Sequence, residues 1–178
     1  MTHSALPSTV TYVEGFEPGY LGRIAQMHGE YYAMAWGSGV GFEALMAQEI
    51  AEFYEQYHPE RDLLLTAHVA GRLVGCIAIL GTLSERPGEA RLRWFLLEEG
   101  FQGQGIGSRM LARALEFCRE QGFPTVYLWT VEGLPGSLHL YEKTGFRIVE
   151  RFADARYTLE HTNLRLEKPL REKTPPAE

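Results

Sequence analysis

The residues with the clearest chemical potential form one short loop, which reads Gln-Gly-Gln-Gly-Ile-Gly-Ser from Gln102 to Ser108. An apolar run at 91–97 precedes it, and from Ile106 the apolar residues recur on one face of a helix that Gly122 would end. Such a turn leaves backbone N–H groups unpaired at the positive end of the helix dipole, and glycine lets an anion approach them. The loop predicts a phosphate site, with an ordinary tight turn as the alternative.

The spacing of the glycines excludes two common nucleotide motifs. The dinucleotide fingerprint needs glycines at its first, third and sixth positions, and a Walker A loop ends in Gly-Lys-Ser/Thr. Instead, Gln102-x-x-Gly105-x-Gly107 after an apolar strand resembles the pyrophosphate-binding signature of the GCN5-related N-acetyltransferases (GNATs). The segment 140–146, Leu-Tyr-Glu-Lys-Thr-Gly-Phe, resembles a second familiar segment of that family. The resemblance covers most of the chain, from about residue 9 to residue 168.

The elements expected from periodicity have the order that this resemblance implies. The strands are expected at 9–14, 63–69, 73–80, 91–97, 125–131, 146–153 and 162–167, and the helical stripes at 21–35, 42–57, 106–118 and 135–144. The resemblance implies an α/β fold with a mixed, mostly antiparallel seven-stranded sheet and about four helices. Its fourth and fifth strands are parallel and splay apart to admit an acyl-coenzyme. We expect one domain at 9–170, a flexible start at 1–8 and a disordered tail at 171–178.

Composition narrows the class of function. The 178 residues are 45% hydrophobic and carry a net charge of −6, so we expect a globular protein with no nucleic-acid partner and a mild preference for cationic substrates. Cys76 and Cys118 lie in apolar segments, which predicts buried thiols and no disulfide. We expect a cytoplasmic protein, because the chain has neither an export signal nor a membrane span. The scattered histidines predict no metal site.

The resemblance implies that acetyl-CoA is the acyl donor. The amides of Gly103 to Ser108 would hold its pyrophosphate with help from the Gln102 side chain. Main-chain groups of Phe95 and Leu97 would pair with its pantetheine arm, and an N–H near Leu97 would stabilise the thioester oxygen. The expected coenzyme contacts are therefore Phe95, Leu97, Gln102, Gly103, Gln104, Gly105, Ile106, Gly107 and Ser108.

Tyr141 is the expected general acid, because it stands at the tyrosine position of the 140–146 segment. A phenol can give a proton to a thiolate formed beside it. The alternative is that its ring only packs beneath a helix. The general base stays open among Glu98, Glu132, His28 and His139, because strand 91–97 lacks the glutamate that some relatives use. Leu134 also replaces an asparagine that many relatives carry seven residues before the tyrosine.

Aromatic residues on the first helix and the fifth strand are the expected acceptor-binding set. They are His28, Tyr31, Tyr32, Trp36 and Trp129. Such rings could surround an amine and make cation–π contacts with a charged one, although plain helix packing explains each of them as well. The glycine-rich loop at 37–41 is the expected mobile lid.

The sequence thus predicts an acetyl-CoA-dependent N-acetyltransferase that acts on a primary amine by direct attack in a ternary complex. The amine belongs to a small molecule or a protein, and a homodimer stays open because dimers are common in the family. A non-catalytic acyl-CoA-binding module is the alternative from another class, and transfer of a longer acyl group is a third. Several segments, among them 92–96 and 128–130, are also similar to the acetyltransferase half of MarR-type regulator fusions.

Overall fold

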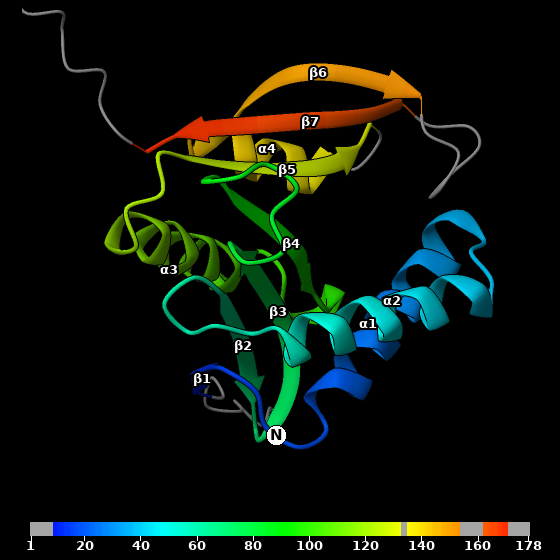
Figure 1. Cartoon of the computed structure of the whole chain (residues 1–178). Helices are drawn as coiled ribbons and strands as arrows, with labels where there is room; N and C mark the ends of the chain where they lie inside the picture. The colour runs from blue at the N-terminus through cyan, green and yellow to red at the C-terminus, as the bar shows by residue number, and fades with distance from the viewer. Residues whose placement is uncertain (1–8, 133–134, 154–161, 171–178) are drawn as a thin grey trace, which may run out of the picture.

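The computed structural model describes residues 9–132, 135–153 and 162–170, and in this part the chain forms one seven-stranded sheet with helices on both faces (Figure 1). The strand order is β1-β2-β3-β4-β5-β7-β6. The strands are β1 (Val10–Glu14), β2 (Leu63–Val69), β3 (Arg72–Leu80), β4 (Ala90–Leu97), β5 (Thr125–Val131), β6 (Arg147–Ala153) and β7 (Thr162–Pro169). The helices are α1 (Tyr20–Trp36), α2 (Val40–Glu55), α3 (Ile106–Glu120) and α4 (Pro135–Lys143), with a short 3-10 turn η1 (Glu99–Phe101).

The expected fold class and element order are confirmed, and the bounds differ by a few residues. Strand β3 begins at Arg72, β4 begins at Ala90, and β7 continues to Pro169. The two central strands β2 and β3 are buried on both faces, as their continuous apolar runs predicted. The expected flexible ends at 1–8 and 171–178 lie outside the described residues, as does Leu134.

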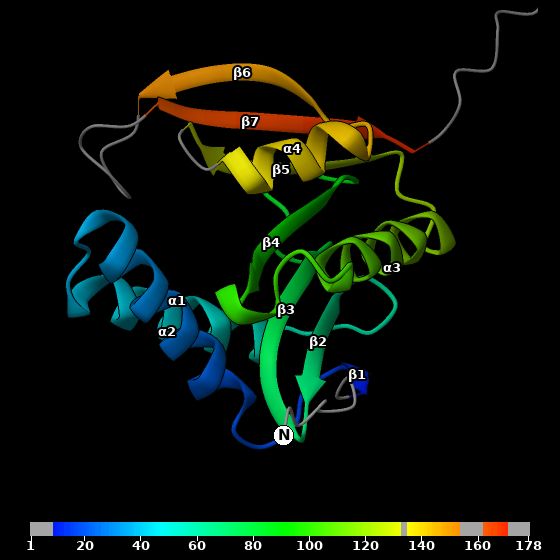
Figure 2. The ribbon, with the colours of Figure 1, turned by 180° about the vertical axis from the view of Figure 1, so that it is seen from behind.

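Helices lie on both sides of the sheet (Figure 2), and the buried side chains form two hydrophobic cores, one on each side. Helices α3 and α4 cover one face, where Met110, Leu111 and Leu128 are almost fully buried. Helices α1 and α2 cover the other face, where Ile24 and Phe53 are at most 1% exposed. Each helix contributes an apolar stripe at the spacing expected for an amphipathic helix, so burial of that stripe fixes its position against the sheet.

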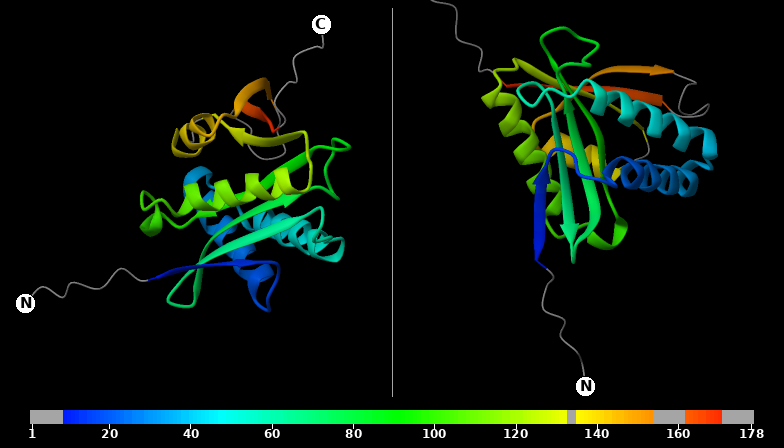
Figure 3. Two further views of the ribbon diagram at one scale, coloured as in Figure 1. Left: turned by 90° about the vertical axis from the view of Figure 1, so that its left-hand side faces the viewer. Right: turned by 60° about the horizontal axis from the view of Figure 1, so that its bottom comes forward.

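Strands β4 and β5 join the two halves of the sheet along a very short contact. They run parallel, and their registered pairs are only Ala90 with Val126 and Arg91 with Tyr127. Beyond Arg91 the strands diverge, so the half that holds β1–β4 and the half that holds β5–β7 form a wedge (Figure 3). The backbone groups of β4 that face β5 have no neighbouring strand to pair with from that point on.

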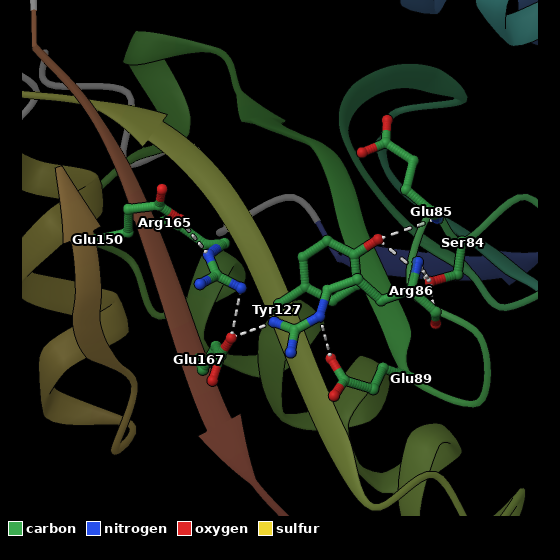
Figure 4. A network of polar contacts seen from close by, with 8 residues as sticks. All are labelled: Ser84, Glu85, Arg86, Glu89, Tyr127, Glu150, Arg165 and Glu167. Atoms are coloured by element: carbon green, nitrogen blue, oxygen red, sulfur yellow. Dashed lines mark hydrogen bonds and ion pairs between the residues drawn. The ribbon is translucent and has the colours of Figure 1, made fainter. Parts of the chain in front are cut away.

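A cluster of polar side chains, here called the Arg86 network, holds the closed end of the wedge (Figure 4). Arg86, in the loop before β4, forms ion pairs with Glu167 on β7 and with Glu89. The Tyr127 hydroxyl on β5 accepts a hydrogen bond from the Glu85 backbone N–H at 3.1 Å and lies 3.1 Å from the Ser84 hydroxyl. These contacts link the loop of one half to two strands of the other, where the strand pairing is short.

Strand β4 contains a β-bulge at Trp94. The two-residue step from Cys76 to Ala78 on β3 faces the three-residue step from Arg93 to Leu96 on β4. Trp94 absorbs the extra residue with a φ of 47°, and its carbonyl accepts a hydrogen bond from the Cys76 thiol at 3.1 Å. Arg93 and Trp94 therefore both face α1 and α2, and Phe95 then packs against the opposite core.

Candidate active site

A cavity of about 160 Å³ opens in the wedge on the side of α1 and α2. Its walls come from both halves of the sheet, from both N-terminal helices and from α4. They comprise His28, Tyr31, Tyr32, Trp36, Phe42, Met46, Arg91, Leu92, Arg93, Trp94, Phe95, Leu96, Trp129, Thr130, Val131, Ser137, Tyr141, Phe152 and Asn163. The five residues expected to bind the acceptor therefore share one cavity with Phe95 and with Tyr141.

The aromatic wall is a connected group of rings on α1 and α2. The ring of Tyr32 lies at its centre, 5.1 Å from the Tyr31 ring, 4.6 Å from Trp36 and 4.8 Å from Phe42. Burial raises the pKa of Tyr32 to about 12, so its hydroxyl is neutral at physiological pH. Contacts at these distances stabilise the α1–α2 pair and also form one side of the cavity.

Tyr141 lies on α4, lines the cavity and is 5% exposed. Its ring packs against Phe95 from β4, with centroids 6.1 Å apart, and against Phe146 at 5.6 Å. The hydroxyl makes no hydrogen bond to any described residue. Burial raises the pKa of this phenol above its ordinary value, so the group keeps its proton at physiological pH.

The glycine loop lies beyond β4, at the start of α3. Gly103 and Gly105 adopt left-handed φ values of 74° and 79°, which favour glycine. No described residue accepts a hydrogen bond from the backbone N–H groups of 103–108, so these donors form an unused set at a helix start. A Cβ at Gly103 or Gly105 would have no atom within 4 Å, whereas one at Gly107 would touch the Phe95 ring at 3.5 Å.

The two glutamines of the loop brace it from within. The Gln102 side chain donates to the Leu97 carbonyl at 2.9 Å, and the Gln104 side chain donates to the Gly100 carbonyl at 3.1 Å. In this conformation both amides stabilise the connection from β4 to α3. The backbone N–H groups are the donors that the loop leaves available to an anion.

Two arginines of β4 belong to the cavity, although the sequence reasoning did not assign them to a site. Arg91 forms an ion pair with Glu85 at 2.8 Å, and its guanidinium lies 4.1 Å from the centre of the Trp129 ring. Arg93 forms an ion pair with Glu49 on α2 at 2.7 Å. Their spacing of two along an apolar central strand was the available signal, because charged residues at that spacing share one face of the strand.

Comparison with known proteins gives a match over the part of the chain that contains β4, the glycine loop and α4. A model described as the Acetyltransferase (GNAT) family matches residues 24–146. The chain belongs to the GNAT family. N-acetyltransferase family 8 member 2 of Rattus norvegicus is 29% identical over 101 residues, 56% of this chain and 45% of that protein. The uncharacterized N-acetyltransferase YvbK of Bacillus subtilis is 29% identical over 104 residues, 58% of this chain and 64% of the relative. The chain spans about half the length of the rat relatives that it matches.

Solved structures show the same GNAT architecture at low sequence identity. An N-acetyltransferase from Staphylococcus aureus Mu50 has a TM-score of 0.75, with 14% identity over 92% of this chain and 100% of the other. The ribosomal-protein-S18-alanine N-acetyltransferase from Escherichia coli has a TM-score of 0.67, with 19% identity over 96% of this chain and 99% of the other. These likenesses show the fold. In the described part of this GNAT domain, no helix is long and apolar enough to cross a membrane.

Three of the four candidates for the general base do not reach the cavity of this GNAT domain. Glu98 is held in ion pairs with Arg23 and Arg72, and Glu132 lies 3.9 Å from Arg151 at the surface. His139 is exposed on α4. None of the three candidates lines the cavity.

His28 is the one of the four candidates that does line the cavity. Its Nδ1 lies 2.8 Å from the Ile24 carbonyl and must donate to it, because a carbonyl oxygen only accepts. Burial lowers the pKa of this imidazole to about 4. His28 is therefore neutral at physiological pH and too weak a base to hold a proton taken from an alkylammonium.

The GNAT loop and strand fit a coenzyme that carries a diphosphate and an amide-containing arm. The unused N–H groups of 103–108 are suited to phosphate oxygens, and the open space at Gly103 and Gly105 lets a ligand reach them. The Leu97 carbonyl is already occupied by Gln102, which leaves the other outward main-chain groups of β4 for the arm. Arg113 is held by Glu14 and Glu120, so its charge is already compensated.

Proposed function

We propose that the protein transfers the acetyl group of acetyl-CoA to a primary amine by direct attack. The observation that carries this proposal is the meeting of two features at Phe95 and Tyr141. On one face of the sheet the glycine loop offers unused N–H donors, and its Gly107 lies beside the Phe95 ring. On the other face the aromatic cavity reaches Phe95 and Tyr141, whose rings pack together, through the wedge. A donor and an acceptor entering from opposite faces would be brought together between the diverging strands.

Each of the expected site residues then has a defined task. Acetyl-CoA supplies an activated acetyl group, held through the amides of 103–108 and through main-chain groups of Phe95 and Leu97. The N–H near Leu97 stabilises negative charge on the carbonyl oxygen during transfer. The Tyr141 hydroxyl, kept protonated by burial, holds the proton that the departing sulfur requires. His28, Tyr31, Tyr32, Trp36 and Trp129 surround the acceptor.

Direct attack is favoured over an acetyl-cysteine route by the state of the two thiols. Cys76 and Cys118 are both fully buried, and neither lines the cavity. Burial raises the pKa of each thiol to about 12, so neither forms a thiolate at physiological pH. The similarity of several segments to MarR-type fusions is compatible with this chemistry and names no acceptor.

The test is release of free thiol from acetyl-CoA against a broad panel of amines, combined with calorimetry of coenzyme binding. Coenzyme binding and amine-dependent thiol release support the enzyme. Coenzyme binding without thiol release for any amine would support a non-catalytic acyl-CoA-binding module instead. The same assay with succinyl-CoA in competition tests whether a longer acyl group is preferred, and absence of coenzyme binding would refute the proposal.

A further inference from the structure

The charge of the cavity restricts the acceptor. Among the described residues that line it, the charged side chains are Arg91 and Arg93, and none is aspartate or glutamate. His28 is neutral, so it adds no negative charge. Arg91 and Arg93 are each paired with a glutamate outside the lining, so the cavity has no carboxylate of its own to bind a polyamine or another acceptor that carries only positive charge.

The aromatic rings nearest to the arginines reinforce this restriction. The Arg91 guanidinium lies over Trp129 at 4.1 Å, and the Arg93 guanidinium lies 4.9 Å from the Trp94 ring centre. A cation–π contact places one cation on one ring face. On these two rings the contact is already made by the protein itself, which reduces what they offer to a substrate ammonium.

Arg93 retains donors that can bind an anion. One of its terminal nitrogens donates to Glu49 at 2.7 Å, and its other N–H groups have no acceptor among the described residues. Its side chain is 15% exposed, and its positive charge contributes to the pKa of both His28 and Tyr32 across the cavity. The planar guanidinium fork suits a carboxylate, which it can bind through two parallel hydrogen bonds.

We propose, as an extension of the proposed function, that the acceptor is a compact amino acid whose carboxylate binds Arg93 while its amine faces Phe95 and Tyr141. The rings of Tyr32, Trp36 and Phe42 then surround an apolar side chain. A volume of about 160 Å³ is close to that of an engineered cavity that holds benzene, which favours a small molecule over a protein segment.

The half-enclosed cavity also helps to prepare the amine. Removal from water disfavours the charged ammonium form, so a bound amino acid loses its ammonium proton to water more readily than the free molecule does. The neutral nitrogen then forms the N–C bond as the C–S bond breaks. The sulfur takes the Tyr141 proton, and the second proton of the amine returns to Tyr141. A cavity without a carboxylate base can in this way still supply a neutral nucleophile.

The experiment compares amino acids with the amines that lack only their carboxylate: L-phenylalanine with 2-phenylethylamine, and L-leucine with 3-methylbutylamine. For the wild-type protein we expect kcat/KM for thiol release to favour the amino acid by about 10- to 100-fold, the range of a charge-assisted hydrogen bond. Calorimetry of the same four compounds with the CoA-bound protein should show a carboxylate preference as well.

Variants of Arg93 connect this preference to one side chain. Arg93→Met should remove the preference, and Arg93→Lys should retain part of it. Arg113→Met is the matched control, because it also removes an ion-paired arginine but one that lies outside the cavity, and it should keep the full preference. If Arg93→Met does not fold, the double variant Arg93→Met/Glu49→Gln removes the charge together with its partner.

Equal or better turnover of the decarboxylated amines by the wild-type protein would overturn the inference, as would a full preference in Arg93→Met. Failure of the proposed function can be distinguished from failure of this inference. If no compound releases thiol, calorimetry still decides: tighter binding of the amino acids through Arg93 upholds the inference, and tighter binding of the plain amines refutes it.

Discussion

Replacing Tyr141 with phenylalanine removes one oxygen atom from the site with little structural cost. The ring contacts with Phe95 and Phe146 remain, and the lost hydroxyl has no hydrogen-bond partner in the described chain. We expect the free energy of unfolding to change by less than about 0.5 kcal/mol. Turnover should fall by about 10²- to 10⁴-fold, which raises the activation barrier by about 3 to 5 kcal/mol.

Tyr127→Phe is the matched control, because it removes the same atom from another buried tyrosine. This hydroxyl does have partners, the Glu85 backbone N–H and the Ser84 hydroxyl. Its loss leaves a donor unsatisfied and should lower the free energy of unfolding by about 1 to 3 kcal/mol. Turnover per folded molecule should stay near that of the wild type, since Tyr127 does not line the cavity.

Thiol release at saturating acetyl-CoA and urea unfolding of both variants make the comparison. Calorimetry should show acetyl-CoA binding to Tyr141→Phe within about twofold of the wild type, because the lost group acts on the transition state more than on the bound coenzyme. A Tyr141→Phe protein that keeps more than half of its turnover would refute the assignment of the general acid. Equal losses of turnover in both variants would indicate a structural effect instead.

Three further changes test other parts of the structure. Burial lowers the pKa of His28 from 6.5 to about 4, so the unfolded chain binds the proton first. The free energy of unfolding should therefore fall by up to about 3 kcal/mol as the pH decreases from 6.5 to 4, and urea unfolding of His28→Gln across the same pH range should show a flatter profile. Asp62→Ala removes the carboxylate that accepts from three backbone N–H groups at 2.8 to 2.9 Å, which should cost about 3 kcal/mol in urea unfolding, against a smaller loss for Asp62→Asn. Gly105→Ala should weaken acetyl-CoA binding more than tenfold by calorimetry, since its methyl group would stand before the loop amides. Gly15→Ala is the control, because Gly15 has a similar positive φ of 88°. It should lower the free energy of unfolding by about 1 kcal/mol and leave the affinity for acetyl-CoA unchanged.

Local patterns predicted the parts of the site that depend on neighbouring residues in the chain. Around Gly105 the period of the apolar residues changes from two to 3.6, and this change located β4, the loop and α3. The backbone conformation there follows from short-range sterics and from burial of one helix stripe. The aromatic residues of α1 could be grouped for the same reason. His28, Tyr32 and Trp36 follow one another at intervals of four residues and share one helix face.

The rest depended on contacts between distant segments. Trp94 is a non-glycine residue with a positive φ, and nothing in an apolar strand indicates where a bulge will form. The bulge decides that Trp94 shares a face with Arg93, and so places the Trp94 ring in the cavity beside that guanidinium. The hydrogen bond of the Gln102 side chain to the Leu97 carbonyl could not be predicted either, because it forms only when the turn is complete. The low pKa of His28 follows from burial, which no local pattern gives.

Because the sheet divides the interior into two cores, a substitution in one core should have little influence on the effect of a substitution in the other. Ile24 and Phe53 belong to one core and Met110 and Leu111 to the other, and no side chain of the first group packs with the second. Substitutions at well-separated sites generally have additive effects on stability. Selection, or an engineer, can therefore remodel the packing of α1 and α2 on one side of the sheet with little effect on the core beneath α3 on the other side.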